Sequence, residues 1–175
     1  NAALIANDAV CEGQAANVTF TMTGTGPFNV TYTVDGNPTS LSNINSPHTF
    51  QITPTGETTL ELLAVTDVGT GCSSPASGTA TVFVTPRPDA GIPSGNAQFC
   101  DSDIATQNLF DLLEGEDPGG TWTDIQGNQI PNGLLDVGPL EPGLHVFRYT
   151  LPPVTPCPGD FEDVEVLIFE NPVAD

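Results

Sequence analysis

The chain has 175 residues, of which 22 are acidic and only two, Arg87 and Arg148, are basic, so its formal net charge at pH 7 is −20. A chain this acidic repels phosphate backbones and anionic lipid surfaces, which argues against nucleic acid and membrane surfaces as partners. It contains no run of about 18 apolar residues, so we expect no membrane insertion.

A proline-rich stretch near the middle, residues 85–91, separates two halves that repeat each other. Its two prolines and its glycine cannot continue a strand ladder. Three residues recur with a spacing of 86 (169−83): Phe83, Pro86 and Asp89 match Phe169, Pro172 and Asp175. We therefore predict two tandem modules, 1–86 and 87–175, from a longer array. The predicted interdomain joint comprises Phe83, Pro86, Arg87, Pro88, Asp89, Phe169 and Pro172.

Each predicted module contains two of the four cysteines. Three pairings are possible, and the repeat favours the one within modules, Cys11 with Cys72 and Cys100 with Cys157. Each such disulfide would add about 4 kcal/mol on the chain-entropy model. Persistent disulfides indicate an oxidising compartment outside the cytoplasm. Zinc is a poor alternative, because the sequence has no CxxC pair and its two histidines lie far from any cysteine.

The first module consists of short segments in which apolar and polar residues alternate, the pattern of half-buried strands. Residues 17–23 and 28–34 alternate strictly, and the second segment ends at an Asp-Gly turn signal. Helical periodicity is absent. The predicted strands are 4–10, 17–23, 28–34, 48–53, 58–66 and 79–85. Six or seven strands with frequent turns are typical of a β-sandwich.

The second module is more acidic, with 16 of the 22 acids, because only six lie in residues 1–86. Its one ambiguous stretch is 102–113, where either Asp103 caps a short helical turn or residues 108–113 form a strand. Strands are predicted at 120–124, which carries the only Trp, at 143–151 and at 164–169. In the second of these, Phe147, Tyr149 and Leu151 should point inward. The predicted fold is all-β: two tandem Ig-like β-sandwich domains arranged end to end.

The last strand of each module carries a phenylalanine on its outer face. If Val82 and Val84 point into one core, and Val166 and Ile168 into the other, alternation turns Phe83 and Phe169 outward. One interpretation is contact with the neighbouring module, which would stiffen the joint. The alternative is a strand that is buried on both faces within its own sandwich.

The order Cys100, Trp122, Cys157 invites comparison with the Cys-Trp-Cys arrangement of immunoglobulin domains. The second cysteine, however, falls in a proline-rich loop, 152–158, after the strand that carries Tyr149. We therefore expect a bridge between a sandwich end and a loop, and not the antibody type that crosses between sheets.

Residues 11–36, with Asn17-Val18-Thr19, Gly26-Pro27-Phe28 and Val34-Asp35-Gly36, resemble the Ig-like and PKD-like modules of large secreted adhesins in gliding bacteria. Residues 119–157, with Gly-Gly-Thr-Trp-Thr-Asp and Phe-Arg-Tyr-Thr, resemble the same modules. The resemblance implies a sandwich fold, export by the type IX route, and display in long surface arrays or filaments. It implies no catalytic residue.

The sequence offers no constellation of nucleophile and base, so we expect no enzyme. His48 and His145 have no neighbouring Ser, Cys or carboxylate and are interpreted as structural. Calcium is the candidate cofactor, because clustered carboxylates are its preferred ligands. The alternative, which we favour over a tight site, is solvated loop charge. The candidate ligands are Asp101, Asp103, Glu116, Asp117, Glu162 and Asp163.

These observations predict a non-catalytic structural and adhesive repeat of an extracellular bacterial surface protein, acting as a stiff spacer. Its expected partners are neighbouring modules of the same chain or filament, with surface glycans or other cells as further candidates. The alternative function is a carbohydrate-binding accessory module of a secreted enzyme.

Overall fold

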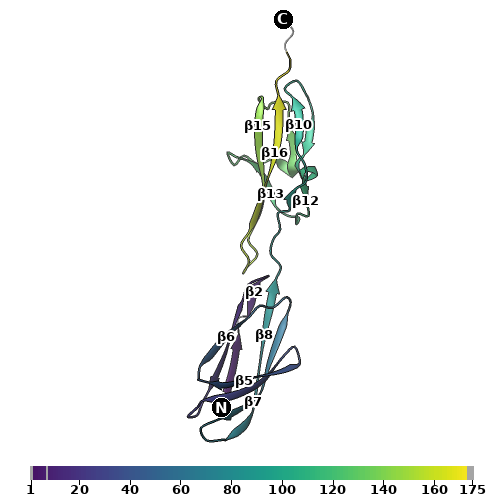
Figure 1. Cartoon of the computed structure of the whole chain (residues 1–175). Helices are drawn as coiled ribbons and strands as arrows, with labels where there is room; N and C mark the ends of the chain where they lie inside the picture. Colours follow the sequence, from purple (N-terminus) through teal and green to yellow (C-terminus); the bar gives the residue numbers. More distant parts are fainter. Residues whose placement is uncertain (1, 7, 173–175) are drawn as a thin grey trace. The chain divides into compact units, whose positions relative to one another are not determined.

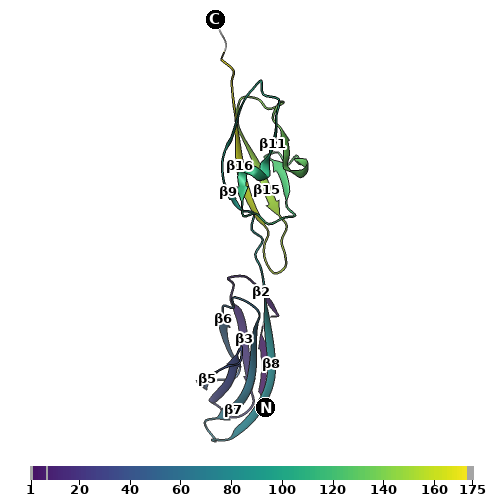
Figure 2. The ribbon, with the colours of Figure 1, turned by 90° about the vertical axis from the view of Figure 1, so that its right-hand side faces the viewer.

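The computed structural model describes residues 2–6 and 8–172, so Asp175 of the repeat match lies outside the described residues. The chain is all-β and forms two compact units (Figures 1 and 2). Unit 1 comprises Asn1–Pro86 together with Thr155–Cys157, and unit 2 comprises Arg87–Val154 and Pro158–Asp175. The described residues form no helix that is long and apolar enough to span a bilayer.

Unit 1 is a sandwich of two sheets. The smaller sheet is antiparallel, in the order β1-β3-β6, with β1 at Ala2–Ala6, β3 at Ala16–Met22 and β6 at His48–Ile52. The larger sheet has the order β2-β8-β7-β4-β5. Its strands are β2 (Ala9–Cys11), β4 (Phe28–Val34), β5 (Asn37–Ile44), β7 (Thr58–Asp67) and β8 (Ser73–Thr85).

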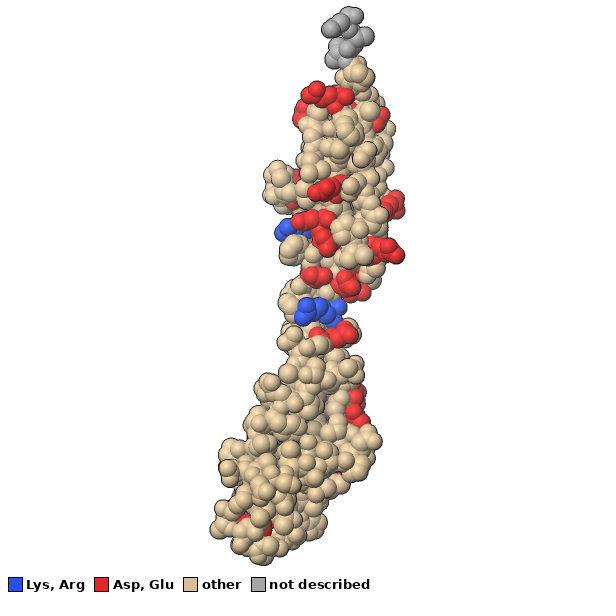
Figure 3. Space-filling model, in the orientation of Figure 1, with Lys and Arg blue, Asp and Glu red and all other residues tan. Residues whose placement is uncertain are grey.

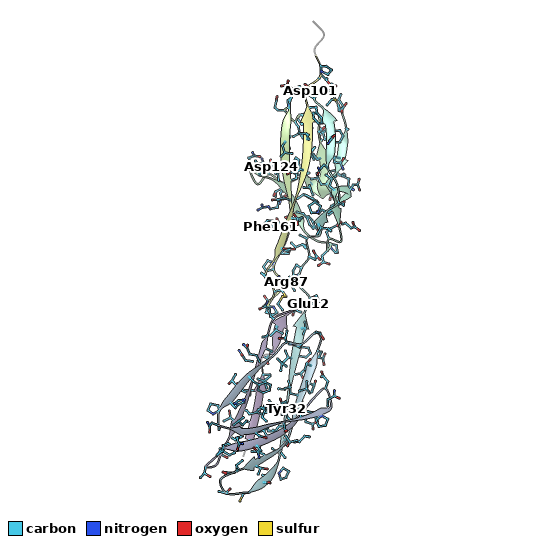
Figure 4. All side chains as sticks on the ribbon, in the orientation of Figure 1. Glu12, Tyr32, Arg87, Asp101, Asp124 and Phe161 are labelled. Atoms are coloured by element: carbon cyan, nitrogen blue, oxygen red, sulfur yellow. A yellow bond between two sulfur atoms is a disulfide. The ribbon has the colours of Figure 1, made fainter. Side chains whose placement is uncertain are left out.

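Alternating side chains of the two sheets fill the core of unit 1, as the period of two in the sequence predicts. In β3, Val18, Phe20 and Met22 are buried while the threonines between them face outward. The Phe20 ring meets Tyr32 of β4 edge-on at 5.1 Å between centroids and stacks on Phe50 of β6 at 5.8 Å. Figure 4 labels Tyr32, which lies between the two sheets. Aromatic contacts thus join both layers.

Three details of unit 1 differ from the sequence prediction. The predicted opening strand 4–10 is two strands in different sheets, since β1 pairs with β3 and β2 pairs with β8. The strand β5 was not predicted, because its first four residues are exposed and polar or proline and carry no alternation. The strand β8 begins six residues earlier than predicted, over a stretch rich in serine and alanine that has little apolar signal.

Unit 2 is built on one four-stranded sheet in the order β10-β16-β15-β13. These strands are β10 (Ala97–Cys100), β16 (Asp160–Phe169), β15 (Gly143–Leu151) and β13 (Thr121–Asp124). Its other layer is made of short ribbons and 3-10 turns. They are β9 (Ile92–Pro93) paired with β12 (Leu113–Glu114), β11 (Thr106–Asn108) paired with β14 (Leu134–Asp136), and the turns η1 (Leu109–Leu112) and η2 (Pro131–Gly133).

The core of unit 2 is centred on three aromatic rings. Phe110, Trp122 and Tyr149 lie 5.2–5.6 Å apart in pairs, and Trp122 is 2% exposed. Phe147, Tyr149 and Leu151 are all buried, which confirms their predicted inward orientation. The Tyr149 hydroxyl donates to Asp117 O at 2.8 Å and accepts from Gly120 N–H at 2.9 Å. Through these two hydrogen bonds, Tyr149 of β15 holds the loop that precedes β13, residues 117–120, against the main sheet.

The ambiguous stretch 102–113 contains both a strand and a helical turn. The turn is η1, and its cap is Asn108, whose side chain accepts from Phe110 N–H. Asp103, the predicted cap, instead accepts from Cys100 N–H at 2.7 Å. Of the two alternatives, the strand at 108–113 is not formed, because Leu109 and Leu112 are buried from a 3-10 turn, three residues apart on one face.

The last strands have the predicted orientation. Val82 is fully buried in unit 1, and Val166 and Ile168 are buried in unit 2. Phe83 is 52% exposed and Phe169 is 47% exposed, so both point outward as the alternation requires. The alternative of a last strand buried on both faces is therefore wrong at these two positions.

Substitution of Gly120 tests the packing around Tyr149. A Cβ at Gly120 would lie 2.5 Å from Tyr149 Cζ and 2.8 Å from Thr150 O, too close for either to remain in place. We expect Gly120→Ala to destabilise unit 2 by about 1–3 kcal/mol. Denaturant unfolding followed by Trp122 fluorescence measures it, because the only Trp lies in this unit. Gly95→Ala, where a Cβ meets nothing within 4 Å, is the matched control. Equal stability of the two variants would contradict this packing.

Candidate functional site

The most distinctive chemical feature of the chain is the disulfide Cys11–Cys157, with Cα atoms 4.9 Å apart and a sequence separation of 146. Cys72 and Cys100 are free and exposed. The predicted pairing of Cys11 with Cys72 and of Cys100 with Cys157 is therefore wrong. The expectation that the bridge would involve the proline-rich loop, and not join two sheets in the antibody manner, holds for Cys157.

Strand length is the reason that the predicted pairs cannot form. Cys72 immediately precedes the 13-residue strand β8, whereas Cys11 lies opposite Thr85, the last residue of that strand. At about 3.3 Å per residue the two cysteines are roughly 40 Å apart. Cys157 likewise lies before β16, and Cys100 lies opposite Phe169, the last residue of that strand. A disulfide requires Cα atoms within about 7 Å.

The bonded cysteines are well shielded from solvent. Cys11 is 4% exposed and Cys157 is 2% exposed. Cys11 ends β2, which pairs in parallel with β8, and the turn after it is held by two backbone hydrogen bonds of 2.9 Å. In these, Glu12 N–H donates to Thr85 O and Gln14 N–H donates to Cys11 O. Cys157 comes from the loop between β15 and β16. Burial makes the bridge poorly accessible to reductants.

Acidic side chains are concentrated in unit 2, and many lie on the face shown in Figure 3. The six candidate calcium ligands come from three places. Asp101 and Asp103 follow β10, Glu116 and Asp117 follow β12, and Glu162 and Asp163 lie within β16. Among the described residues no three His, Cys, Asp or Glu side chains gather in a way that could hold a metal ion. Calcium binding therefore remains a prediction from sequence.

Most of these candidate ligands have protein partners. Asp103 accepts from Cys100 N–H, and Asp117 accepts from Asp89 N–H at 3.0 Å. Glu162 accepts from Asp163 N–H, also at 3.0 Å. A cation at any of these positions would have to compete with the backbone for the carboxylate. Among the six candidates, all of them described residues, only the carboxylates of Asp101 and Glu116 accept no hydrogen bond from the protein.

Asp163 forms the single ion pair among the described residues. Both its carboxylate oxygens accept from Arg148, at 2.8 Å from Nε and 2.8 Å from Nη2. The guanidinium carbon also lies 4.1 Å from the centroid of the Phe161 ring, which Figure 4 labels. The hydrogen bonds from Arg148 lower the pKa of Asp163 despite partial burial, and they raise the pKa of Arg148.

The predicted joint residues divide between the units. Pro86 ends the main segment of unit 1 and Arg87 begins unit 2, and both are exposed. Asp89 is tied to unit 2, because its carbonyl accepts from Asp117 N–H and its own N–H donates back to Asp117. Pro88 is buried and Pro172 is exposed. The role of these residues as a joint remains a prediction.

Two carboxylates that organise loops were missed by the sequence analysis. Asp67 accepts from the N–H groups of Thr25, Gly26 and Thr70, and these bonds outweigh burial and lower its pKa. Asp124 accepts from Asn128, through both its side chain and its backbone, and its pKa is also lowered. The sequence could have indicated the role of Asp124, because Asp-x-x-Gly-Asn at residues 124–128 is typical of a turn held by the Asp side chain.

Neither histidine belongs to a catalytic arrangement of described residues. His48 stacks on Phe50 at 6.2 Å between centroids, and His145 Nε2 lies 2.7 Å from Glu141 O. Both contacts support the structural interpretation.

Acidification should remove the contribution of the Arg148–Asp163 pair. The folded-state pKa of Asp163 is lowered. Its contribution is therefore complete above the unfolded value of about 3.9 and is lost as pH falls through the folded value. Because the pair is largely exposed, we expect Asp163→Asn to cost about 1 kcal/mol or less at pH 7, and the difference from wild type to shrink as pH falls below about 3.9. Urea unfolding followed by Trp122 fluorescence measures both values.

Glu165→Gln is the control for charge removal, because Glu165 lies on the same strand and forms no ion pair with a described residue. If Glu165→Gln changed stability and its pH dependence as much as Asp163→Asn, the effect would be one of net charge and the pair would contribute nothing.

Calcium is tested by thermal melting with and without a chelator. A site with micromolar Kd at millimolar calcium adds about 4 kcal/mol, which is a shift of several degrees in Tm for units of this size. Asp101→Asn together with Glu116→Gln should remove part of that shift. Identical melting curves in calcium and in chelator would contradict the calcium prediction.

No family model and no curated protein matches the chain. Among similar solved structures is a three-domain titin fragment in an E-to-A variant, with 12% identity and a TM-score of 0.46 over 98% of this chain and 65% of that chain. Sidekick-1 immunoglobulin domains 1–5 have 16% identity and a TM-score of 0.45, over 93% and 37%.

A third similar structure belongs to a 1.5-MDa bacterial ice-binding adhesin, with 12% identity and a TM-score of 0.41 over 97% of this chain and 65% of that chain. The chain spans less than two thirds of each of these three chains.

Proposed function

We propose that this chain is a non-catalytic, load-bearing spacer: a pair of repeat modules in an extracellular bacterial surface protein. The observation that carries the proposal is the Cys11–Cys157 disulfide, which closes 146 residues of sequence separation into a covalent ring. The same bond supports an extracellular location, since disulfides persist in oxidising surroundings. The resemblance to modules of gliding bacteria adds the type IX route and a surface filament to the proposal.

The ring changes how the chain would respond to a pull on its two ends. Tension would pass from the N-terminus to Cys11, across the sulfur–sulfur bond, and from Cys157 to the C-terminus. Of the strands formed by the described residues, only β1, β2 and β16 lie on this path. The other strands lie inside the ring, where force on the termini cannot draw them out. About 500 Å of extended chain is thereby withheld from stretching.

This arrangement suits a spacer better than it suits a binding module, because a binding module gains nothing from inextensibility. Carbohydrate-binding surfaces commonly present aromatic faces, yet the only Trp and both Tyr are buried here. The Phe161 side chain is 55% exposed, but the Arg148 guanidinium lies over its ring, 4.1 Å from the centroid. No observation among the described residues favours the accessory carbohydrate-binding module, so we do not propose it.

Single-molecule stretching tests the spacer function. With handles at both termini, the oxidised chain should extend by no more than about 100 Å of contour, from the ten residues before Cys11 and the eighteen after Cys157. After reduction, two unfolding events should appear, each releasing about 300 Å less the folded length of one unit.

Single cysteine variants give a matched pair for this measurement. Cys11→Ser should behave like the reduced chain without any reductant, whereas Cys72→Ser, which removes a free thiol, should remain locked. Full extension of oxidised wild type, or the same trace from both variants, would overturn the load-bearing role.

A further inference from the structure

The two sequence repeats, 1–86 and 87–175, have their cysteines at equivalent positions. Cys11 ends β2 opposite Thr85, and Cys100 ends β10 opposite Phe169, in both cases in a parallel pairing with the last strand of the unit. The turns that follow are also the same. Asp101 N–H donates to Phe169 O and Asp103 N–H donates to Cys100 O, each at 2.9 Å, as Glu12 and Gln14 do around Cys11. Figure 4 labels Glu12 and Asp101, the residues after the two cysteines.

The remaining two cysteines correspond in the same way. Cys157 lies between β15 and β16, the last two strands of unit 2, which pair antiparallel. Cys72 lies between β7 and β8, the last two strands of the other unit, which also pair antiparallel. The loops differ in length, since Cys72 directly precedes β8 and Cys157 stands three residues before β16. Both cysteines nevertheless lie where the last strand begins.

The formed disulfide therefore joins a strand-end cysteine of one repeat to a loop cysteine of the next repeat in the chain. Cys100 is a strand-end cysteine without a partner, and Cys72 is a loop cysteine without one. Neither can bond within its own repeat, because the length of the last strand separates the two positions. Cys100 thus occupies the position that corresponds to Cys11, and Cys72 the position that corresponds to Cys157, the two cysteines that are bonded.

We propose that Cys72 and Cys100 are the two halves of further bonds of this kind. Cys100 would bond to the loop cysteine of a following repeat, and Cys72 to the strand-end cysteine of a preceding one, so that successive repeats form a continuous ladder of disulfides. The partner is another repeat of this type. The inference rests on the same bridge as the proposed function, but it concerns bond connectivity and not force.

Hydrogen bonds hold the loop that carries Cys72, and the cysteine itself is exposed. Asp67 N–H donates to Cys72 O at 2.9 Å, and Gly71 N–H donates to Asp67 O at 2.8 Å. The Asp67 carboxylate holds the neighbouring chain segments through the N–H groups of Thr25 and Gly26. A cavity of about 310 Å³ opens beside Cys72, lined in part by Phe28 and Pro75. The turn of a partner repeat would therefore meet an exposed cysteine on a hydrogen-bonded backbone, with free space beside it.

Bond formation is a two-electron oxidation. Two Sγ–H bonds break and one Sγ–Sγ bond forms, while two electrons and two protons reduce one disulfide of an oxidant to two thiols. The oxidant is a low-molecular-weight disulfide or the active-site disulfide of a thiol oxidase, either of which an oxidising compartment contains.

Two copies of the chain fused directly test the ladder. In this fusion, Cys72 of the second copy lies 147 residues after Cys100 of the first (175−100+72), against 146 for the bond already formed. After oxidation with oxidised glutathione, peptide mapping without reductant should show Cys11–Cys157 in each copy and Cys100 of the first copy bonded to Cys72 of the second. With Cys100→Ser in the first copy, Cys72 of the second should remain alkylatable.

The Cys11–Cys157 bonds report correct folding of each copy. If both bonds form while Cys100 and Cys72 remain free thiols, the ladder is wrong, whatever the outcome of the stretching measurement. If the ladder bond forms but the oxidised chain stretches fully, the ladder stands and the load-bearing function fails.

A second experiment needs no fusion. Separate chains that carry Cys72→Ser or Cys100→Ser each retain one free thiol and are mixed in a glutathione redox buffer. Random pairing would make the Cys100–Cys72 heterodimer half of all dimers. If the two positions recognise each other specifically, the heterodimer should make up well over half. A 1:2:1 distribution of the three possible dimers, or an excess of either homodimer, would overturn the proposal.

Discussion

The parallel pairing of the second strand with the last strand of each unit is the constraint on which the rest of this structure depends. β2 runs parallel to β8, and β10 runs parallel to β16, so one cysteine reaches the far end of the last strand. The other cysteine, Cys72 or Cys157, lies in the loop just before the last strand, and therefore at the beginning of that strand. A β-strand is stiff and rises by about 3.3 Å per residue, so these two thiols are kept apart. The bond that forms is Cys11–Cys157, and not either of the pairs expected within the modules.

That bond has a thermodynamic and a mechanical consequence at once. Closing a ring of this size removes about 5 kcal/mol of loop entropy from the unfolded chain on the chain-entropy model. Small sandwiches with limited cores benefit most from such a restraint. The same closure takes the residues between Cys11 and Cys157 off the path that tension would follow. A single covalent bond thus stabilises the folded modules and limits how far the chain can be drawn out.

The two units build the second layer of their sandwiches in different ways. Unit 1 has two full sheets joined by the aromatic contacts of Phe20. Unit 2 has one full sheet, and its other layer is made of short ribbons and 3-10 turns packed around Trp122. Such loops leave many backbone N–H groups without ladder partners, and carboxylates such as Asp117 and Asp124 accept from them. Part of the acidity of the chain thus serves its loop structure.

The amino-acid sequence by itself determined the all-β class, the two-sandwich fold and the face on which Phe147, Tyr149 and Phe83 lie, because alternation depends only on a local period of two. It did not determine that residues 4–10 change sheets, since one apolar stretch suits either sheet. Nor did it determine the pairing of Cys11 with Cys157. Proximity between residues 146 positions apart depends on the direction and length of whole strands, which only the tertiary structure decides.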